Sequence, residues 1–107
     1  MDLEVVDVAL APCYSMCFEG TTLYTAKTKI TAVDLVTLEV RTLEYKGTAP
    51  CKTIDALNGF VAVHTMNNSI HVLLDGAPFY DLPSFENWVT AVKLTANKTL
   101  TVAFDTN

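Results

Sequence analysis

The chain has little basic charge, few glycines and only three cysteines, and each shortage excludes a class of protein. Its 107 residues contain 7 Lys or Arg against 12 Asp or Glu, which gives a net charge of −5. The basic residues are scattered, whereas nucleic-acid-binding proteins gather them on one face. We therefore expect no direct contact with nucleic acid.

Several motifs of enzymes and membrane proteins are also missing. The four glycines stand alone, so no glycine-rich loop can hold a phosphate group, and no Gly-x-Ser-x-Gly motif marks a hydrolase nucleophile. The longest apolar runs are far shorter than the about 20 residues of a membrane-spanning helix. The acidic start, Met1 to Glu4, differs from the positively charged start of a signal peptide. These features predict a non-enzymatic, intracellular protein (cytoplasmic or nuclear) that does not contact a membrane.

The cysteines and histidines allow one alternative chemistry. An odd number of cysteines does not read as a disulfide framework. Cys13 and Cys17 are four residues apart, which places both on one face of a strand. His64 and His71 flank a predicted turn, so a zinc site can be drawn from these four residues. Buried thiols and hydrogen-bonded histidines are the simpler interpretation, and we expect neither a metal nor a cofactor.

Val and Thr, which suit pleated strands, are plentiful, and turn residues recur about every eight to twelve positions, the spacing of an all-β domain. The clearest hairpin signals are Asn58-Gly59 and Asp75-Gly76, dipeptides that suit turns with positive φ. The predicted strands are 3–10, 14–18, 23–26, 30–35, 38–45, 51–57, 60–65, 69–74, 77–82, 88–94 and 99–104. A short helix over 33–41 is the competing local interpretation, because its apolar residues fit both periods.

A weak repeat groups these strands. Three similar segments contain Leu23, Phe60 and Leu100, at a spacing of about 40 residues, which is typical of stacked sheet units. The prediction is a single β domain over 1–107, divided into consecutive units. These units are a leading strand at 1–10, a first blade at 13–46, a second blade at 51–83 and a partial third blade at 87–107.

A family resemblance rests on three phrases: LYTAKTKITAVDL from Leu23, FVAVHTMNNSIHVLL from Phe60 and WVTAVKLTANKTLTVAF from Trp88. Each resembles the inner strand, turn and return strand of a blade in a WD40-type β-propeller. The Gly-His and Trp-Asp dipeptides of that family are absent, and Asp34 follows Val33 where the family has Trp-Asp. The resemblance implies antiparallel four-stranded blades in an incomplete ring of about two and a half blades. A small β-sandwich or a Greek-key barrel is the alternative fold.

The resemblance also implies a function. A closed propeller has at least about four blades, so we expect this chain to be part of a longer propeller or to need a partner that covers its open edges. It implies a scaffold for protein–protein interaction in a multiprotein complex, with the remaining blades, another copy or another protein as partner. Two other functions stay open: a small-ligand or zinc-binding β-barrel, and a structural protein that self-assembles through its edges.

Four aromatic residues lie between Pro78 and the start of the last hairpin, and they are the candidate interaction residues: Phe79, Tyr80, Phe85 and Trp88. Aromatic side chains dominate the energetics of protein interfaces. Phe79 and Trp88 also suit packing between neighbouring sheets, which is the interpretation that we favour for these two. Tyr80 and Phe85 are therefore the expected anchors for a partner.

Overall fold

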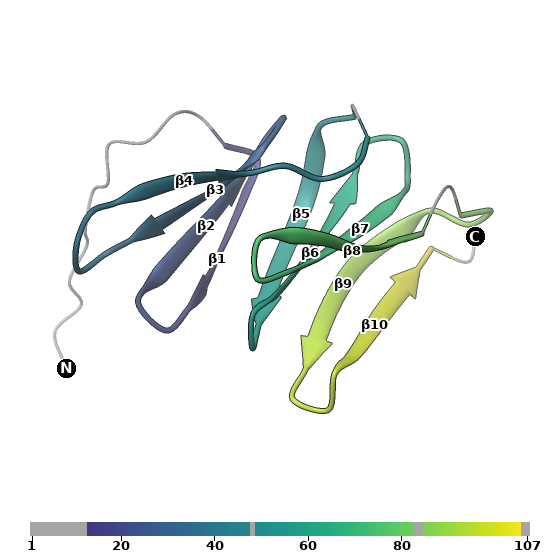
Figure 1. Cartoon of the computed structure of the whole chain (residues 1–107). Coiled ribbons are helices and arrows are strands. Elements are labelled where there is room, and N and C mark those ends of the chain that lie inside the picture. Colours follow the sequence, from purple (N-terminus) through teal and green to yellow (C-terminus); the bar gives the residue numbers. More distant parts are fainter. Residues whose placement is uncertain (1–12, 48, 83–84, 106–107) are drawn as a thin grey trace, which may run out of the picture.

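The computed structural model describes residues 13–47, 49–82 and 85–105. In these residues the chain is all-β, with ten strands and no helix (Figure 1). The strands form three separate sheets, and every strand pair is antiparallel. The predicted all-β class with antiparallel strands is confirmed. The predicted leading strand at 1–10 lies outside the described residues.

The first sheet contains four strands paired in chain order: β1 (Ser15–Glu19), β2 (Thr22–Ala26), β3 (Ile30–Asp34) and β4 (Val40–Leu43). The alternative helix over 33–41 is wrong, because Asp34 ends β3 and fixes a turn. Its Oδ1 accepts hydrogen bonds from the backbone N–H groups of Val36 at 2.8 Å and Thr37 at 3.2 Å. Leu38 has a φ of 64° in this turn, so β4 begins later than the predicted strand.

The second sheet also has four strands in chain order: β5 (Cys51–Leu57), β6 (Phe60–Thr65), β7 (Ile70–Leu74) and β8 (Ala77–Leu82). The bounds of β5, β6 and β8 match the prediction, because both hairpin dipeptides form the expected tight turns. Asn58 and Gly59 have φ of 53° and 84°, and Asp75 and Gly76 have φ of 50° and 85°, the pattern of type I′ turns. The third sheet is a single hairpin of β9 (Val89–Thr95) and β10 (Thr99–Phe104).

The second sheet lies between the other two (Figure 1). Cα atoms of β1 and β5 come within 8 Å, and so do those of β5 and β9, closer than the about 10 Å between sheets packed face to face. The main contacts between sheets therefore lie at their first and second strands. The strands of each sheet pair in chain order, unlike a Greek key, in which the fourth strand lies beside the first.

Two apolar cores hold the three sheets together, one on each face of the second sheet. Ile30 and Ile70 show how the pattern repeats. Each is the first residue of the third strand in its sheet, each is 0% exposed, and each packs in the core toward the next sheet. Burial of such a side chain contributes about 1.5 to 3 kcal/mol. The equivalent positions of Ile30 and Ile70 indicate that both four-stranded sheets direct the start of their third strand toward the following sheet.

Candidate functional site: an apolar groove

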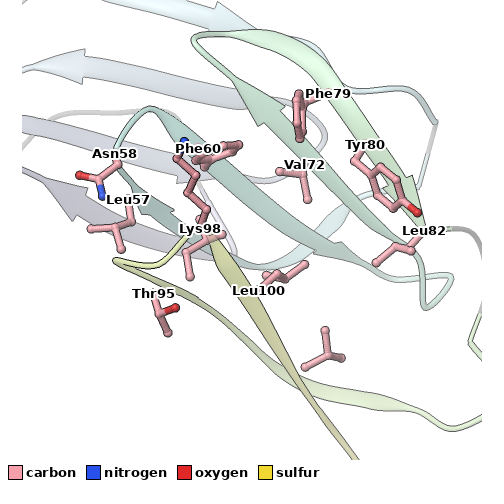
Figure 2. A pocket seen from close by; sticks show the side chains of 12 residues that line it. Leu57, Asn58, Phe60, Val72, Phe79, Tyr80, Leu82, Thr95, Lys98 and Leu100 are labelled. Carbon is pink, nitrogen blue, oxygen red and sulfur yellow. The ribbon is translucent and has the colours of Figure 1, made fainter.

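A groove of about 260 Å³ opens between the second sheet and the β9–β10 hairpin (Figure 2). Its walls come from both sheets. Strand β8 supplies Phe79, Tyr80 and Leu82, and β10 supplies Leu100 and Val102. Most of the other lining side chains are apolar as well. The groove is thus a surface site between two packed sheets.

A β-bulge in β8 places two consecutive aromatic side chains in this groove. Val72 pairs with Tyr80 and Leu73 pairs with Pro78, so Phe79 is an extra residue without its own partner. Consecutive strand residues ordinarily point to opposite faces, and a bulge changes that alternation. Phe79 and Tyr80 therefore both line the groove (Figure 2), and each is 58% exposed.

The exposed aromatics stand above a buried apolar floor. Val72 and Leu94 line the groove and belong to the core between the second and third sheets. Each is only 7% exposed. Phe79 makes an edge-to-face contact with Phe60, with ring centroids 5.5 Å apart. This contact holds the Phe79 ring in one orientation, and the part of the ring that does not touch Phe60 stays accessible.

The other two candidate aromatic residues do not line the groove. Phe85 is partly buried against the same core, and its ring meets that of Phe104 edge to face at 5.3 Å. Trp88 is 42% exposed and lies against His64, with ring centroids 5.8 Å apart. The Lys52 ammonium lies 4.8 Å from the Trp88 ring centroid, within the range of a cation–π interaction. The four candidates are therefore divided among three places, and only Phe79 and Tyr80 share a site.

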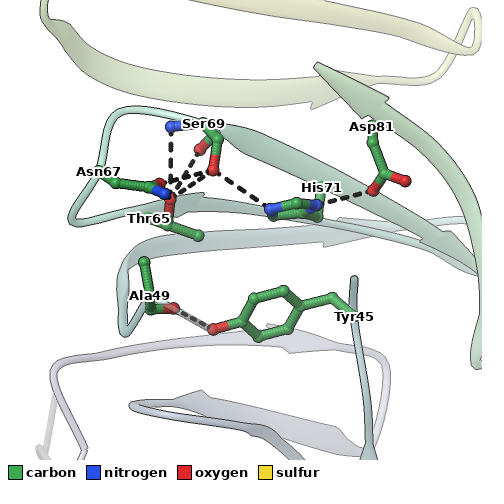
Figure 3. Close-up of polar contacts among 7 residues, drawn as sticks. All are labelled: Tyr45, Ala49, Thr65, Asn67, Ser69, His71 and Asp81. Carbon is green, nitrogen blue, oxygen red and sulfur yellow. Dashed lines mark hydrogen bonds and ion pairs between the residues drawn. The ribbon is translucent and has the colours of Figure 1, made fainter. Parts of the chain in front are cut away.

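A Ser-His-Asp cluster lies on the opposite face of the second sheet (Figure 3). His71 Nδ1 is 2.7 Å from Asp81 Oδ1, and Ser69 Oγ is 3.2 Å from His71 Nε2. This is the order of groups in a hydrolase triad. Ser69, however, is 5% exposed, and its Oγ also bonds to Thr65 Oγ1 at 2.6 Å and to Asn67 Oδ1 at 2.8 Å. The hydroxyl is shielded from substrate, and the cluster instead ties the β6–β7 turn to β8.

Tyr45 covers this polar cluster from the first sheet (Figure 3). Its ring centroid lies 5.1 Å from that of His71, and its hydroxyl donates a hydrogen bond to the Ala49 carbonyl at 2.5 Å. Burial raises the pKa of the Tyr45 hydroxyl well above its usual value, so the group stays a donor at neutral pH. A Cβ atom at Gly47 would lie 3.1 Å from His71 Nε2, so glycine allows the chain to pass close to the imidazole.

The residues of the alternative zinc site are not brought together. Among the residues that the structure describes, no three His, Cys, Asp or Glu side chains are placed to hold a metal ion. Cys13 is exposed, whereas burial raises the pKa of the Cys17 thiol to about 11. His64 Nε2 is hydrogen-bonded to Asn68 at 2.9 Å, and His71 belongs to the polar cluster described above.

Comparisons with protein-family models, curated proteins and solved structures found no match for the chain. The likeness to WD40-type blades therefore stays a prediction. Among the residues that the structure describes, there is no helix long and apolar enough to cross a membrane. The intracellular location also stays a prediction.

Proposed function

We propose that the chain is a non-enzymatic protein–protein interaction module that binds an apolar segment of a partner protein in the groove between β8 and β10. The observation that carries the proposal is the bulge in β8. It presents Phe79 and Tyr80, each 58% exposed, beside a buried apolar floor. Exposed aromatic side chains next to an apolar pocket are the usual anchors of protein interfaces.

The shape and chemistry of the groove favour a polypeptide over a small molecule. Its volume of about 260 Å³ is slightly below the range of roughly 300–1,000 Å³ in which small-molecule sites fall. Among the described residues that line the groove, the polar side chains are few, and Lys98 is the only charged one. A partner segment with apolar side chains meets these properties.

The arrangement of the sheets supports a role as a rigid platform. Two four-stranded sheets and a hairpin lie in chain order, packed most closely at their first strands (Figure 1). This order suits consecutive blades of a WD40-type propeller, in which blades meet near the axis. We therefore include in the proposal that the chain forms part of such a ring, inside the cell and within a multiprotein complex.

The proposal is tested with a pair of charge substitutions at exposed apolar residues. Phe79→Asp places a charge in the groove, and Val36→Asp places one in the β3–β4 turn, where Val36 is 75% exposed. The chain is followed in cell extract by sedimentation, and circular dichroism of each purified variant checks the fold. We expect the wild type and Val36→Asp to sediment as part of a larger complex and Phe79→Asp to sediment alone. Equal sedimentation of the two variants, or a free wild-type chain, contradicts the proposal.

A further inference from the structure

The third sheet offers an open strand edge beside the groove. It has two strands, whereas each of the other two sheets has four. In the described part of the chain, β10 pairs only with β9, so its other edge has no neighbouring strand. The N–H and C=O groups on such an edge are a template for another strand. The groove lies along this side of the hairpin (Figure 2).

The two faces of the second sheet are covered unequally. On the face toward the first sheet, Leu43 of β4 approaches the β7–β8 turn, where a Cβ atom at Gly76 would lie 3.4 Å from its Cδ2 atom. Tyr45, just after β4, packs on His71 of β7. Both contacts come from the outer part of the first sheet. On the opposite face of β7 and β8, the hairpin leaves Tyr80 58% exposed. Strands beyond β10 would cover this face as β4 covers the other.

An added strand would extend an interface that already exists. Val72, Leu94, Leu100 and Val102 line the groove and also form the core between the second and third sheets. A strand placed next to β10 would direct every second side chain toward the same face of the second sheet. Apolar side chains at those positions would continue this core outward to Tyr80.

The antiparallel pairing of the sheets sets the direction of the added strand, and the charge in the groove favours an acidic residue at one end of it. Lys98, exposed in the β9–β10 turn, is the only charged side chain among the described lining residues. It directly precedes Thr99, the first residue of β10. All strand pairs in the three sheets are antiparallel. In an antiparallel addition to β10, the C-terminal end of the new strand would therefore lie beside Lys98.

We infer that the partner binds as an extended strand of another polypeptide, added antiparallel to the free edge of β10. Its alternate apolar side chains occupy the groove, and an acidic residue at its C-terminal end lies beside Lys98. The inference rests on the proposed function and adds how the partner is recognised. Affinity then comes from main-chain hydrogen bonds, and specificity comes from the alternate side chains.

A synthetic peptide serves as the probe. It is the fluorescein-labelled heptapeptide Val-Thr-Val-Thr-Val-Thr-Asp, in which the valines and the aspartate share one face, titrated to about 1 mM, where weak binding is still measurable. Two isomers carry N-methyl groups on the backbone nitrogens of either the valines or the threonines. In an antiparallel pair, only every second residue directs its N–H and C=O groups at the neighbouring strand, so the added strand uses the amides of either the valines or the threonines. We expect one isomer to bind like the parent and the other to bind about a hundredfold more weakly, since its three lost hydrogen bonds cost about 1 kcal/mol each.

A charge exchange tests the direction of the strand. Lys98→Glu should weaken binding of the aspartate peptide about threefold and favour a peptide that ends in lysine, because exposed ion pairs contribute up to about 1 kcal/mol. Equal behaviour of the two methylated isomers, whether both bind or both fail, overturns the inference. So does a parent peptide that does not bind. If Phe79→Asp still abolishes peptide binding while the isomers behave alike, the proposed function stands and only the strand addition fails.

A second copy of the chain is a distinguishable occupant. Light scattering of the purified wild type and of Phe79→Asp measures self-association directly. We expect both to be monomers in the absence of peptide. A wild-type dimer that Phe79→Asp dissociates would place a second copy in the groove and overturn the inference of a different polypeptide.

Discussion

Asn68 and Val89 are joined by a hydrogen bond from the Val89 backbone N–H to the Asn68 side-chain oxygen, with a distance of 2.9 Å. Asn68 lies in the β6–β7 turn, and Val89 begins β9 in the next sheet. An equivalent link occurs one sheet earlier, where the N–H of Cys51, the first residue of β5, donates to the carbonyl of Lys27 at 2.5 Å. The turn of each sheet thus fixes the first strand of the following sheet.

The Asn68 amide is fully used in this position. Its Nδ2 donates to the carbonyls of Phe85 at 3.2 Å and Asn87 at 2.8 Å. Its Oδ1 accepts from Val89 and from His64 Nε2 at 2.9 Å. Two donors and two acceptor sites are the whole capacity of an amide side chain. Because Nδ2 is committed to carbonyls, the network assigns the ring proton of His64 to Nε2.

Asn68→Gly should therefore destabilise the protein strongly. Glycine accepts the φ of 64° at this position, so the substitution removes the side chain without adding backbone strain. We expect the free energy of unfolding to fall by about 2 to 4 kcal/mol, because the buried N–H groups of Val89 and His64 lose their acceptor. Urea denaturation measures the change. The matched control is Asn97→Gly in the exposed β9–β10 turn, with an expected loss under about 1 kcal/mol. Equal losses in the two variants would contradict this role.

His64 should make stability depend on pH. Burial lowers the pKa of His64 below its usual value of 6.5; the hydrogen bond to Asn68 opposes part of this shift, and the charge of Lys52 adds to it. The unfolded chain then binds the proton more readily than the folded chain does. The contribution of neutral His64 to stability is therefore complete above about pH 6.5 and is lost as pH falls toward the folded pKa.

The measurement is the free energy of unfolding at several pH values between about 5 and 8. We expect the free energy of unfolding of His64→Gln to fall less steeply than that of the wild type as pH is lowered. The difference in slope is up to about 1.4 kcal/mol per pH unit for one proton. The other titrating groups are common to both proteins, so the difference between the two curves isolates His64. Parallel curves would show that burial of this imidazole does not determine the acid sensitivity.

The three thiols should react at different rates. Cys13 is exposed, whereas Cys17 is partly buried and Cys51 is fully buried. Burial raises the pKa of the Cys17 thiol to about 11 and also raises that of Cys51, so both lack the reactive thiolate at neutral pH. With iodoacetamide at neutral pH, mass spectrometry should find Cys13 modified first. Modification of Cys17 as fast as Cys13 would contradict its placement between the sheets.

Two glycines with positive φ should differ in their response to alanine. Gly20 has a φ of +58°, and no atom lies within 4 Å of an added Cβ. Gly59 has a φ of +84°, and an added Cβ would lie 2.6 Å from Asp75 Oδ1. We expect Gly20→Ala to cost about 1 to 2 kcal/mol through its backbone alone. Gly59→Ala should cost more, because the Asp75 carboxylate must also move. Thermal denaturation gives the order, and a larger loss for Gly20→Ala would refute it.

The strands could be predicted because their ends are local. Asn58-Gly59 and Asp75-Gly76 adopt positive φ and set the ends of the strands on either side. The alternation of apolar residues then gives the all-β class. Leu38 was harder to place, because its φ of 64° depends on the turn that the Asp34 side chain stabilises, and apolar periodicity alone extends the strand through it.

The groove could not be predicted, because it depends on which faces of distant strands meet. Alternation alone would place Phe79 and Tyr80 on opposite faces, and only the bulge opposite Val72 and Leu73 puts them together. The prediction that Phe79 is buried between neighbouring sheets is wrong, because the bulge leaves this side chain 58% exposed. The polar contacts of Asn68 likewise join it to residues 17 to 21 positions away, and the sequence indicates only that it suits a turn.

The most direct test of the central claim is photo-crosslinking in cells from a photoreactive phenylalanine derivative at the position of Tyr80. The control carries the same group at Val36, which is also exposed but lies in the β3–β4 turn. If the groove binds a partner protein, position 80 should give one discrete crosslinked species that position 36 does not give. The absence of a crosslink at position 80, or the same set of products from both positions, would contradict the account.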